Sequence, residues 1–440
     1  MKIAFLTLGC KVNSYETEKM KTQFETEGYE IVSFSEKADV YVVNTCTVTN
    51  IADRKSRKML HRARRMNPDA VVVAAGCYVD SARQKGEEDE SVDLFIGNED
   101  KEIMISKVEK IMEKRGILNK ENCPGHSVGE MSEKAEQELH TRAYIKIQNG
   151  CNQYCSYCII PYVRGKLESR TEEDILSETK KLAAAGFHEI VLTGIHLSSF
   201  GVDREFKKTD ANSFVKLQGK YLLELLQKMA QISGIERLRL GSLEPRIITE
   251  EFVKKLAEIP EVCPHFHLSL QSGCDATLKR MNRRYTSSEY AEKCKLLRKY
   301  FPNPALTTDV IVGFPGETEE EFKESYDFVD SIDFYETHIF KYSRREGTKA
   351  AVMPDQVDEQ IKAKRSAQLI ELGEKKRAAY EQSFQGKEVE VLVEEDLELN
   401  GKEVQTGHTK EYMKIALETN ENLKNSIVKV QIGKDSQIIH

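Results

Sequence analysis

Hydrophobic positions in the first 116 residues alternate between short β-branched runs and longer segments with helical spacing. The runs predict strands at 3–8, 40–43, 71–75 and 92–96, and the spacing predicts helices at 13–28, 50–67 and 102–115. Parallel strands need crossover connections, usually helices, whereas antiparallel strands need only tight turns. The pattern therefore predicts a parallel α/β sheet domain over residues 1–116.

Apolar periodicity is lost over residues 117–138, and we interpret this polar stretch as a linker. From 139 to 370 strand patterns again alternate with helical ones. Strands are predicted at 144–148, 190–193, 237–240, 265–270, 306–312 and 336–340, and helices at 172–185, 221–232, 287–300 and 318–332. Six such steps predict a partial (β/α)6 barrel, with a polar insertion at 197–219. The active site of such a barrel lies at the carboxyl ends of its strands.

Residues 371–440 predict a third domain. A helix at 354–384 leads into it, and strand-like runs follow at 389–394, 407–412, 413–418 and 427–432. Short strands of this kind suit a small β-barrel. The predicted fold class is therefore α/β, with a small β-barrel at the C-terminal end.

Charge and composition limit the partners. The chain has 440 residues, a net charge of −7 and a pI near 5.9, so nucleic acid can be attracted only by local basic surface. No run approaches the ~20 apolar residues of a membrane span, and we expect a cytoplasmic protein with neither a membrane nor DNA as partner. In a reducing compartment the ten cysteines are metal ligands or reactive thiols rather than disulfides.

The helix at 50–67 is the strongest basic feature. Seven Lys and Arg fall within twelve residues with no acid between them: Arg54, Lys55, Arg57, Lys58, Arg62, Arg64 and Arg65. A solvated helix face is the usual meaning of such a run, but the missing acids exclude alternating ion pairs along it. Contact with nucleic-acid phosphates is the alternative.

Three thiols on one short loop, Cys151, Cys155 and Cys158, indicate a metal site after the first barrel strand. Iron-sulfur clusters usually have four thiolate ligands, so three would leave one iron of a 4Fe-4S cube open to a small chelating ligand. A structural zinc ion needs four closed ligands, and only His140 is close in sequence. The spacing favours the cluster, with zinc or unpaired core cysteines as alternatives.

A second set of thiols, Cys10, Cys46 and Cys77, follows three predicted strands of the first domain. Because parallel strands end at one edge of a sheet, these cysteines can converge although 36 and 31 residues separate them. Three separate buried cysteines are the alternative. The other four cysteines have no assigned role, and we interpret them as buried thiols: Cys123, Cys263, Cys274 and Cys294.

The sequence motifs around these cysteines resemble those of one enzyme family. Cys-x3-Cys-x2-Cys at 151–158 resembles the signature of radical S-adenosylmethionine enzymes, and Ile-Ile-Pro-Tyr-Val-Arg-Gly at 159–165 resembles their methylthiotransferase branch. The segments around Cys10, Cys46 and Cys77 look like that family's amino-terminal domain. The resemblance implies two 4Fe-4S clusters: one on Cys151, Cys155 and Cys158, and an auxiliary one, which delivers sulfur, on the first-domain cysteines.

The resemblance also implies two uses of S-adenosylmethionine. One molecule would donate a methyl group to sulfur at the auxiliary cluster, and another would be reduced and cleaved to a 5′-deoxyadenosyl radical that activates a C–H bond. Its pocket would include Gly194, Glu244 and Gln271, each near a predicted strand end. Turn chemistry at Gly194 and helix capping by Glu244 are the alternatives. No catalytic side chain is assigned.

Two C-terminal sequence motifs resemble the TRAM domain, an RNA-binding barrel of tRNA-modifying enzymes. They are Gly407-His408-Thr409 and Glu411-Tyr412. Its charge does not suit this role, because seven Lys stand against eleven Asp and Glu from Phe384 onward. Aromatic and polar contacts would have to contribute more of the binding. A barrel that serves oligomerisation is the alternative.

Within the family, the sequence motifs of the first domain look like those of enzymes that act on N6-threonylcarbamoyladenosine at tRNA position 37. This implies methylthiolation of adenine C2 in that tRNA, with an electron donor of unknown identity. Adenine C2 is inaccessible in a duplex, which suits an unpaired or flipped anticodon-loop nucleotide. The alternatives are a sister enzyme acting on isopentenyladenosine tRNA or on a ribosomal-protein aspartate, and a non-catalytic iron-sulfur RNA-binding protein.

The sequence differs from the family's motifs at two places that would affect substrate contacts. Glu168 replaces a basic residue, and Val79-Asp80 replaces a small residue and Gln. A threonylcarbamoyl group carries a carboxylate, which an Arg binds well through two parallel hydrogen bonds. Arg164, Arg170 and Arg344 are the candidates for that contact.

Overall fold

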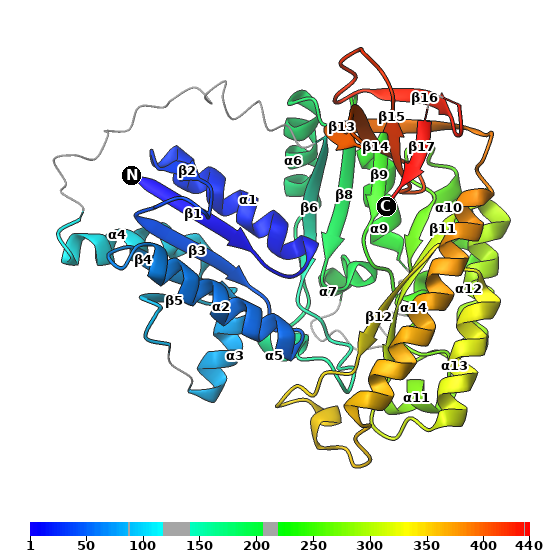
Figure 1. Cartoon of the computed structure of the whole chain (residues 1–440), viewed down its shortest axis with the longest axis horizontal. Helices are drawn as coiled ribbons and strands as arrows, with labels where there is room; N and C mark the ends of the chain where they lie inside the picture. Colours follow the sequence, from blue (N-terminus) through cyan, green and yellow to red (C-terminus); the bar gives the residue numbers. More distant parts are fainter. Residues whose placement is uncertain (87–88, 118–140, 206–218, 435) are drawn as a thin grey trace. The chain divides into compact units, whose positions relative to one another are not determined.

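The structure is a computed structural model that describes residues 1–86, 89–117, 141–205, 219–434 and 436–440 (Figure 1). The predicted linker, Cys123 and most of the predicted insertion lie outside these residues. The chain forms two compact units. The N-terminal unit contains residues 1–138, 157–166 and 343–351, and the barrel unit contains residues 139–156, 167–342 and 352–440. The predicted domain bounds stay predictions.

The N-terminal unit is built on a parallel sheet of five strands in the order β2-β1-β3-β4-β5. The strands are β1 Lys2–Thr7, β2 Glu30–Val32, β3 Val40–Thr45, β4 Val71–Gly76 and β5 Leu94–Ile96. The helices are α1 Lys11–Thr26, α2 Asn50–Met66, α3 Cys77–Lys85 and α4 Met104–Lys114, with the short helix α5 Ile160–Val163 from the segment 157–166. The βαβαβ prediction is confirmed, but β2 and α3 are not predicted.

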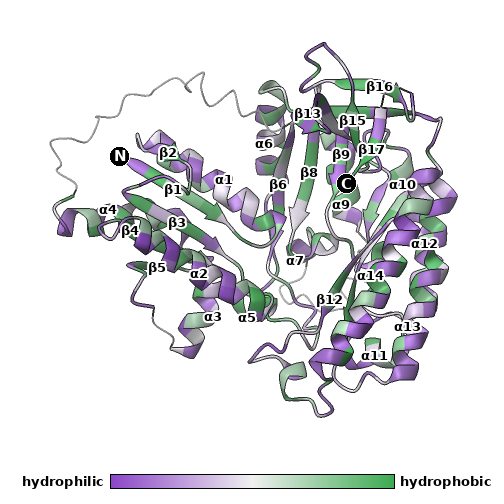
Figure 2. Cartoon of the chain, viewed as in Figure 1, coloured by the Kyte–Doolittle hydropathy of each residue, from purple (hydrophilic) through white to green (hydrophobic). Residues whose placement is uncertain are grey.

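Both faces of this sheet are covered. Every residue of β3 and β4 is buried, as expected for central parallel strands, which appear in Figure 2 as hydrophobic ribbons between amphipathic helices. One face contains Ile3, Phe24 and Val108, and the other contains Ala4, Leu60 and Val79. The edge strand β2 was missed because its three residues are only partly buried or exposed and give a weak apolar signal.

The barrel unit has six parallel strands, as predicted. They are β6 Arg142–Asn149, β8 Glu189–Gly194, β9 Arg237–Leu240, β10 His265–His267, β11 Ala305–Val312 and β12 Glu336–Lys341. Isolated parallel bridges from Leu238 to Val262 and from Leu243 to Leu268 connect the β9 and β10 sides. The two-residue strand β7, Glu168–Ser169, pairs antiparallel with β6.

Helices cover the outside of the barrel (Figure 1). The helices that lie between β7 and β12 in the sequence are α6 Glu172–Ala184, α7 Val202–Glu205, α9 Lys220–Met229, α10 Glu250–Ala257, α11 Asp275–Arg280, α12 Ser287–Tyr300 and α13 Glu319–Ile332. Of these, α7, α10 and α11 are not predicted. Along each strand, alternate residues such as Phe266 and Val310 join the outer hydrophobic core. Their neighbours, including His267 and Asp309, therefore face the inside.

The C-terminal part begins with α14, Glu359–Gln382, and continues as an antiparallel sheet in the order β16-β13-β14-β15-β17. Its strands are β13 Glu388–Leu399, β14 Lys402–Thr409, β15 Lys414–Leu417, β16 Ile427–Gln431 and β17 Ser436–Ile439. This sheet confirms the α/β class with a small C-terminal β domain. The predicted strand boundaries at 394 and 407 are wrong, because β13 and β14 form one long hairpin. Its turn, Asn400-Gly401, has φ +53° and +77°, the conformation that this dipeptide favours.

Buried charges join this sheet to the amino-terminal ends of the barrel strands. Arg239 pairs with Glu189 at 2.7 Å and donates from Nη1 to the Lys410 carbonyl at 2.8 Å. Arg237 donates to the His408 carbonyl at 2.9 Å. The Tyr412 ring lies 4.7 Å from the Arg239 guanidinium and 4.6 Å from the His408 ring. The segment 407–412, whose motifs resemble a TRAM domain, therefore contacts the barrel strands.

The described residues contain no helix that is both long and apolar enough to cross a membrane.

We predict that Glu189→Gln destabilises the barrel unit by about 3 kcal/mol. Glu189 is fully buried, and nearby guanidiniums lower the pKa of its carboxyl despite the opposing effect of burial. Its removal leaves Arg239 and Arg237 without a buried counter-charge. Urea denaturation followed by circular dichroism measures the change, and Glu250→Gln, which breaks an exposed pair with Lys299, is the matched control. Equal midpoints for the two variants would contradict the prediction.

Candidate functional site

The three N-terminal cysteines follow neighbouring strands at one edge of the parallel sheet. Thr45 at the end of β3 pairs with Gly76 at the end of β4. Cys46 and Cys77 therefore leave adjacent strands at the same level. Cys10 follows β1 by three residues, at the start of α1. This register brings the three thiols to one place, as the strand pattern predicts.

Tight backbone packing brings Gly9 against Cys46. Gly9 has φ +100°, and a Cβ there would lie 2.8 Å from Cβ and 2.9 Å from Sγ of Cys46. Burial raises the pKa of the Cys46 thiol to about 11, and the nearby Cys77 and Cys10 thiols add to the rise. Without a bound metal Cys46 is therefore a protonated thiol at neutral pH, and metal binding would displace its proton.

Two kinds of metal site could use these thiols. A structural zinc ion needs four closed ligands, whereas each thiolate of a four-iron cube binds a different iron. Cys46 and Cys77 at adjacent strand ends, with Cys10 at the start of α1, could each bind one iron of such a cube. Among the described residues, only His267, Asp309 and His338 form a set of three potential ligands whose donor atoms all lie within 4.8 Å of one another.

Arg164 completes this site from the segment 157–166. Its Nε donates to Cys77 Sγ at 3.2 Å, and its Nη1 donates to Glu16 Oε1 at 3.0 Å. The side chain is 1% exposed. Arg164 therefore already has a carboxylate partner inside the protein, and the hypothesis that it binds a substrate carboxylate is wrong.

The loop after β6 is anchored to a turn of the barrel unit. Ser156 N donates to the Met281 carbonyl at 3.0 Å, and Asn282 Nδ2 donates to the Tyr154 carbonyl at 2.9 Å. Tyr154 has φ +50° and Asn282 has φ +59°, so both segments turn sharply where they meet. The loop carrying Cys155 thus has a defined conformation at the carboxyl end of the first barrel strand.

Arg283 lies beside this loop and supplies a positive charge. Its Nη1 donates to Cys155 Sγ at 3.4 Å, and its Nη2 donates to the Ser269 carbonyl at 2.9 Å. Burial raises the pKa of the Cys151 thiol to about 12, whereas the Arg283 charge acts in the opposite direction. Cys158, the third cysteine of the motif, belongs to the segment 157–166 of the N-terminal unit.

The three residues predicted for S-adenosylmethionine lie at strand ends of the barrel unit. Gly194 ends β8, where a Cβ would lie 3.0 Å from Gln148 Oε1. Glu244 is buried, caps the short helix at 245–247 and pairs with Arg246 Nε at 2.7 Å. Gln271 has φ +73°, an uncommon conformation for a residue with a side chain. The capping alternative for Glu244 is therefore present, and the cofactor roles of all three stay predictions.

Three polar side chains near this loop were missed in the sequence: Arg246, Arg283 and His196. Arg246 Nη2 donates to Gln153 Oε1 at 3.2 Å, and so connects Glu244 to the cysteine loop. His196 is partly buried, and loss of solvent around the ring together with the charges of Arg283 and Arg246 lowers its pKa to about 3. Each follows a strand at a different distance in sequence, so only the folded barrel brings them together.

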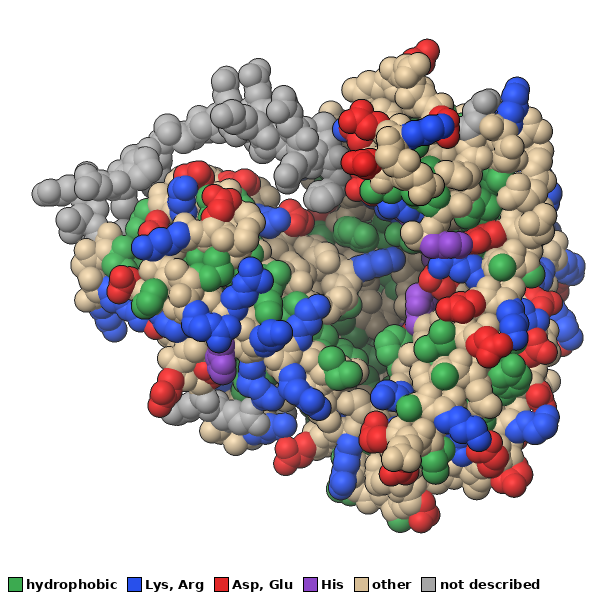
Figure 3. Space-filling model, viewed as in Figure 1, with side chains coloured by type: hydrophobic (Ala, Val, Ile, Leu, Met, Phe, Trp, Pro, Cys, Tyr) green, Lys and Arg blue, Asp and Glu red, His purple; other side chains and the backbone are tan. Residues whose placement is uncertain are grey.

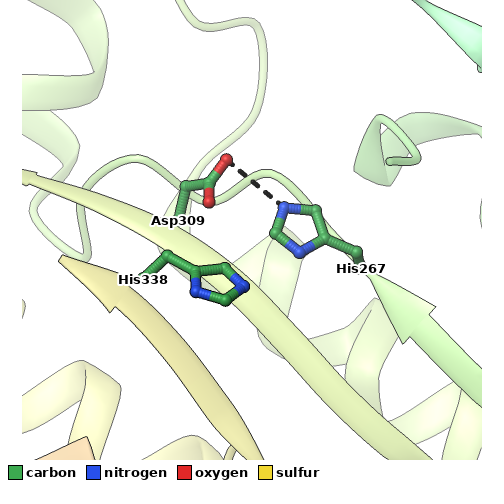
Figure 4. Close-up of side chains that lie close together, drawn as sticks. All are labelled: His267, Asp309 and His338. Atoms are coloured by element: carbon green, nitrogen blue, oxygen red, sulfur yellow. Dashed lines mark ion pairs between the residues drawn. The ribbon is translucent and has the colours of Figure 1, made fainter. Parts of the chain in front are cut away.

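The inner face of the last three barrel strands is polar. His267, Asp309 and His338 come from β10, β11 and β12 and converge there (Figure 4). His267 Nε2 lies 3.3 Å from Asp309 Oδ2, and its Nδ1 lies 3.0 Å from Thr307 Oγ1. Asp309 is opposite His338 in the strand register. These groups could hold a divalent cation or contact a polar substrate, and an ion pair with a protonated His267 would satisfy Asp309 without either.

The remaining candidates have different surroundings. Arg170 is half-buried and pairs with Glu178 at 2.6 Å. Arg344 is exposed, whereas the next residue, Arg345, is buried and pairs with Asp53 at 2.7 Å. Three of the four cysteines without an assigned role, Cys263, Cys274 and Cys294, are buried as expected.

Comparisons with known proteins identify the two main parts. Residues 145–329 match the family model of the Radical SAM superfamily. Residues 2–97 match the model described as uncharacterized protein family UPF0004. Together these matches cover the barrel strands β8 to β11 entirely and the strands that precede Cys10, Cys46 and Cys77.

Relatives with assigned activities match almost the whole chain. The threonylcarbamoyladenosine tRNA methylthiotransferase MtaB of Bacillus subtilis (strain 168) is 41% identical over 434 residues, which are 98% of this chain and 94% of that protein. The chain belongs to the radical S-adenosylmethionine methylthiotransferase family. The protein of the same name from Aquifex aeolicus (strain VF5) is 41% identical over 90% of this chain and 93% of its own length.

A more distant member of the methylthiotransferase family is the tRNA-2-methylthio-N(6)-dimethylallyladenosine synthase of Thermoanaerobacter sp. (strain X514). It is 36% identical over 88% of this chain and 81% of its own length. A solved structure, the radical S-adenosylmethionine methyltransferase TsrM from Kitasatospora setae, has a TM-score of 0.53 at 16% identity and covers 80% of this chain and 75% of that chain. This likeness confirms the radical S-adenosylmethionine fold.

Membership of this superfamily implies an iron-sulfur cluster and S-adenosylmethionine as cofactors. The residues present suit both, since the described barrel unit places Cys151, Cys155 and the cationic Arg283 at the carboxyl ends of its strands. The Arg283 contact would stabilise a thiolate, which is the form that binds iron.

We predict that iodoacetamide labels Cys10 well before Cys46 in iron-free protein at pH 8. Cys10 is exposed, whereas Cys46 is buried and the burial keeps its pKa near 11, so few Cys46 thiolates exist at this pH. Cys46 labelling should rise as the pH approaches 11. Peptide mass spectrometry of the labelled protein measures both sites, and equal labelling at pH 8 would contradict this assignment.

Proposed function

We propose that this protein methylthiolates C2 of N6-threonylcarbamoyladenosine at position 37 of tRNA. The observation that carries the proposal is the 41% identity to a threonylcarbamoyladenosine tRNA methylthiotransferase over 98% of the chain. The geometry supports it, because Cys46 and Cys77 follow parallel strands of the N-terminal unit, and Cys151 and Cys155 follow the first parallel strand of the barrel unit. The reaction would use S-adenosylmethionine both as methyl donor and as radical source.

In this proposal each cysteine set holds one 4Fe-4S cluster. The cluster on Cys151, Cys155 and Cys158 would supply the electron that cleaves S-adenosylmethionine to a 5′-deoxyadenosyl radical. The protein's part is to hold the thiolates, and Arg283 donates to Cys155 for this purpose. Gly194 and Gln271 would position the bound cofactor at neighbouring strand ends, and Glu244 would hold Arg246 toward the loop. An external electron donor completes the reaction.

The auxiliary set, Cys10, Cys46 and Cys77, would hold the second cluster and present the sulfur. Gly9 lets the Cys10 segment approach Cys46 without a side chain between them.

Substrate selection is the point where sister enzymes differ. The dimethylallyladenosine relative is 36% identical, against 41% for the threonylcarbamoyladenosine relatives, and this difference favours the latter substrate. With Arg164 enclosed in the N-terminal unit and Arg170 paired with Glu178, Arg344 is the remaining candidate for the substrate carboxylate. Its exposure leaves it accessible to a ligand.

The exposed face of α2 would contact tRNA phosphates. Figure 3 shows Lys and Arg side chains gathered over this helix. Its buried face holds the Cys46 segment, where Ser56 Oγ donates to the Cys46 carbonyl at 3.2 Å. Arg64 pairs with Asp93 at 2.5 Å and is structural. The other six cations have no acidic partner among the described residues: Arg54, Lys55, Arg57, Lys58, Arg62 and Arg65. Unpaired cations on one rigid face suit a polyanion.

Loss of the gene should abolish the 2-methylthio derivative of N6-threonylcarbamoyladenosine, and wild-type protein should restore it, as measured by mass spectrometry of tRNA nucleosides. Cys158→Ala and Cys46→Ala should each fail to restore the product. In purified protein, Cys158→Ala should form no 5′-deoxyadenosine, whereas Cys46→Ala should retain some, because cleavage of S-adenosylmethionine would need only the cluster on Cys151, Cys155 and Cys158.

Anaerobically reconstituted wild-type protein should bind about eight iron atoms, four for each cube, and each variant should bind fewer. Cys294→Ala is the matched control, since Cys294 is a buried core thiol away from both sets. Normal amounts of the modified nucleoside with either cluster variant, or an unchanged nucleoside pool without the gene, would refute the proposed function.

Replacement of Lys55, Lys58 and Arg62 by Gln should weaken tRNA binding without changing the preference for one modified adenosine. These side chains are exposed on α2, and each lost phosphate contact should lower the slope of log affinity against log salt concentration by about 1. Filter binding at several salt concentrations measures the effect. Three exposed cations on outer helices of the barrel unit, Lys254, Lys295 and Lys323, are the matched controls when replaced by Gln. An unchanged slope in the α2 variant would exclude this surface.

A further inference from the structure

Arg164 belongs to a buried polar network beneath the first-domain cysteines. Its Nη2 donates to Asn13 Oδ1 at 2.6 Å, in addition to its bonds to Cys77 and Glu16. Lys101 Nζ also pairs with Glu16 Oε2. All of these residues belong to the N-terminal unit, and their side chains are at most about one-tenth exposed.

The network ties this charge to the strand ends that carry the thiols. Asn13 Nδ2 donates to the Leu8 carbonyl at 2.7 Å and to the Thr45 carbonyl at 2.9 Å, which are residues close before Cys10 and Cys46. Asn44 Nδ2 donates to the Asn13 carbonyl at 2.9 Å. A substitution at Arg164 would therefore alter the hydrogen-bond network that reaches the segments of all three cysteines.

Cations and hydrogen-bond donors surround Cys77 in this network. Arg164 and Lys101 both contact the carboxylate of Glu16. Cys77 Sγ accepts hydrogen bonds from Arg164 Nε at 3.2 Å and from Asn98 Nδ2 at 3.6 Å. A guanidinium stays charged when it is buried, so this arrangement suits a sulfur that carries negative charge when it binds iron.

We propose that Arg164 is a positioning residue that holds the Cys77 thiolate and raises the reduction potential of the auxiliary cluster, with Glu16 acting in the opposite direction. The inference rests on the proposed function, since it requires a cluster at this site. Net charge and hydrogen bonds to sulfur are among the factors that set cluster potentials. A fixed positive charge beside a thiolate stabilises the reduced, more negative state. A carboxylate beside that cation offsets part of this effect.

A purely structural role for Arg164 predicts something else. Removal of either Arg164 or Glu16 would then loosen the same network, and both changes would act on the cluster in the same direction. The electrostatic role predicts opposite signs. The sign of the change in potential therefore separates the two explanations.

The experiment uses the full-length chain with Cys151, Cys155 and Cys158 replaced by Ala, so that iron can bind only at the auxiliary site. Iron content after anaerobic reconstitution should be about four per chain. The midpoint potential is measured by mediated titration with dithionite, followed by electron paramagnetic resonance. Relative to this parent, Arg164→Gln should lower the potential and Glu16→Gln should raise it.

Two further variants control for folding and for remote charge. Arg164→Lys keeps the positive charge but loses the planar fork, and its potential should stay closer to the parent than that of Arg164→Gln. Arg64→Gln removes an Arg of the same unit that pairs with Asp93, and should leave the potential unchanged. Circular dichroism and iron content confirm that each variant is folded and loaded.

Each result is decisive. Shifts in the same direction for Arg164→Gln and Glu16→Gln, or no shift in either, overturn the role of Arg164 but leave the proposed function intact. If Arg164→Gln fails to load iron, Glu16→Gln and Arg164→Lys still test the sign. An iron-free parent protein overturns the auxiliary cluster itself, and this inference with it.

Discussion

The parallel arrangement of strands is the constraint on which both units depend. Parallel strands with helical crossovers all end at the same edge, so residues that follow different strands meet there regardless of their distance in sequence. In the N-terminal unit this constraint gathers Cys46 and Cys77, through the pairing of Thr45 with Gly76. In the barrel unit it gathers Gly194, Glu244 and Gln271 near the cysteine loop. The candidate site of each unit therefore lies at the carboxyl ends of its strands.

An arginine contacts each set of cysteines: Arg164 is buried, and Arg283 is partly buried. Arg164 donates to Cys77 and Arg283 donates to Cys155, each from a segment distant in sequence from the cysteine it contacts. A guanidinium stays charged when buried and offers several donors in a fixed plane, so it can hold a thiolate and a second acceptor together. The second acceptor is Glu16 for Arg164 and the Ser269 carbonyl for Arg283. Each arginine would thus stabilise one cysteine in the thiolate form that binds iron.

The opposite end of the barrel uses buried charge for assembly. Arg237 and Arg239 donate hydrogen bonds to carbonyl groups of the C-terminal sheet, and Arg239 also pairs with Glu189. The Tyr412 ring lies against Arg239. This face of the TRAM-like sheet is consequently engaged with the barrel. RNA contacts of that sheet would have to come from its other faces, whereas the unpaired cations of α2 offer the stronger electrostatic surface.

Local patterns in the sequence determined the strand-helix alternation, the six barrel strands and the two sets of three cysteines, because hydrophobic period and thiol spacing are properties of short segments. They missed α10, which lies between two strands that were predicted correctly, and they split the β13–β14 hairpin although Asn400-Gly401 marks its turn. They also left Arg164 as a candidate for contact with the substrate carboxylate. Only tertiary structure decided that Arg164 is enclosed with Glu16 and Cys77, since burial and charge partners depend on contacts between segments as far apart as residues 16, 77 and 164. Long-range packing, which no local pattern encodes, turned an expected substrate contact into part of the candidate metal site.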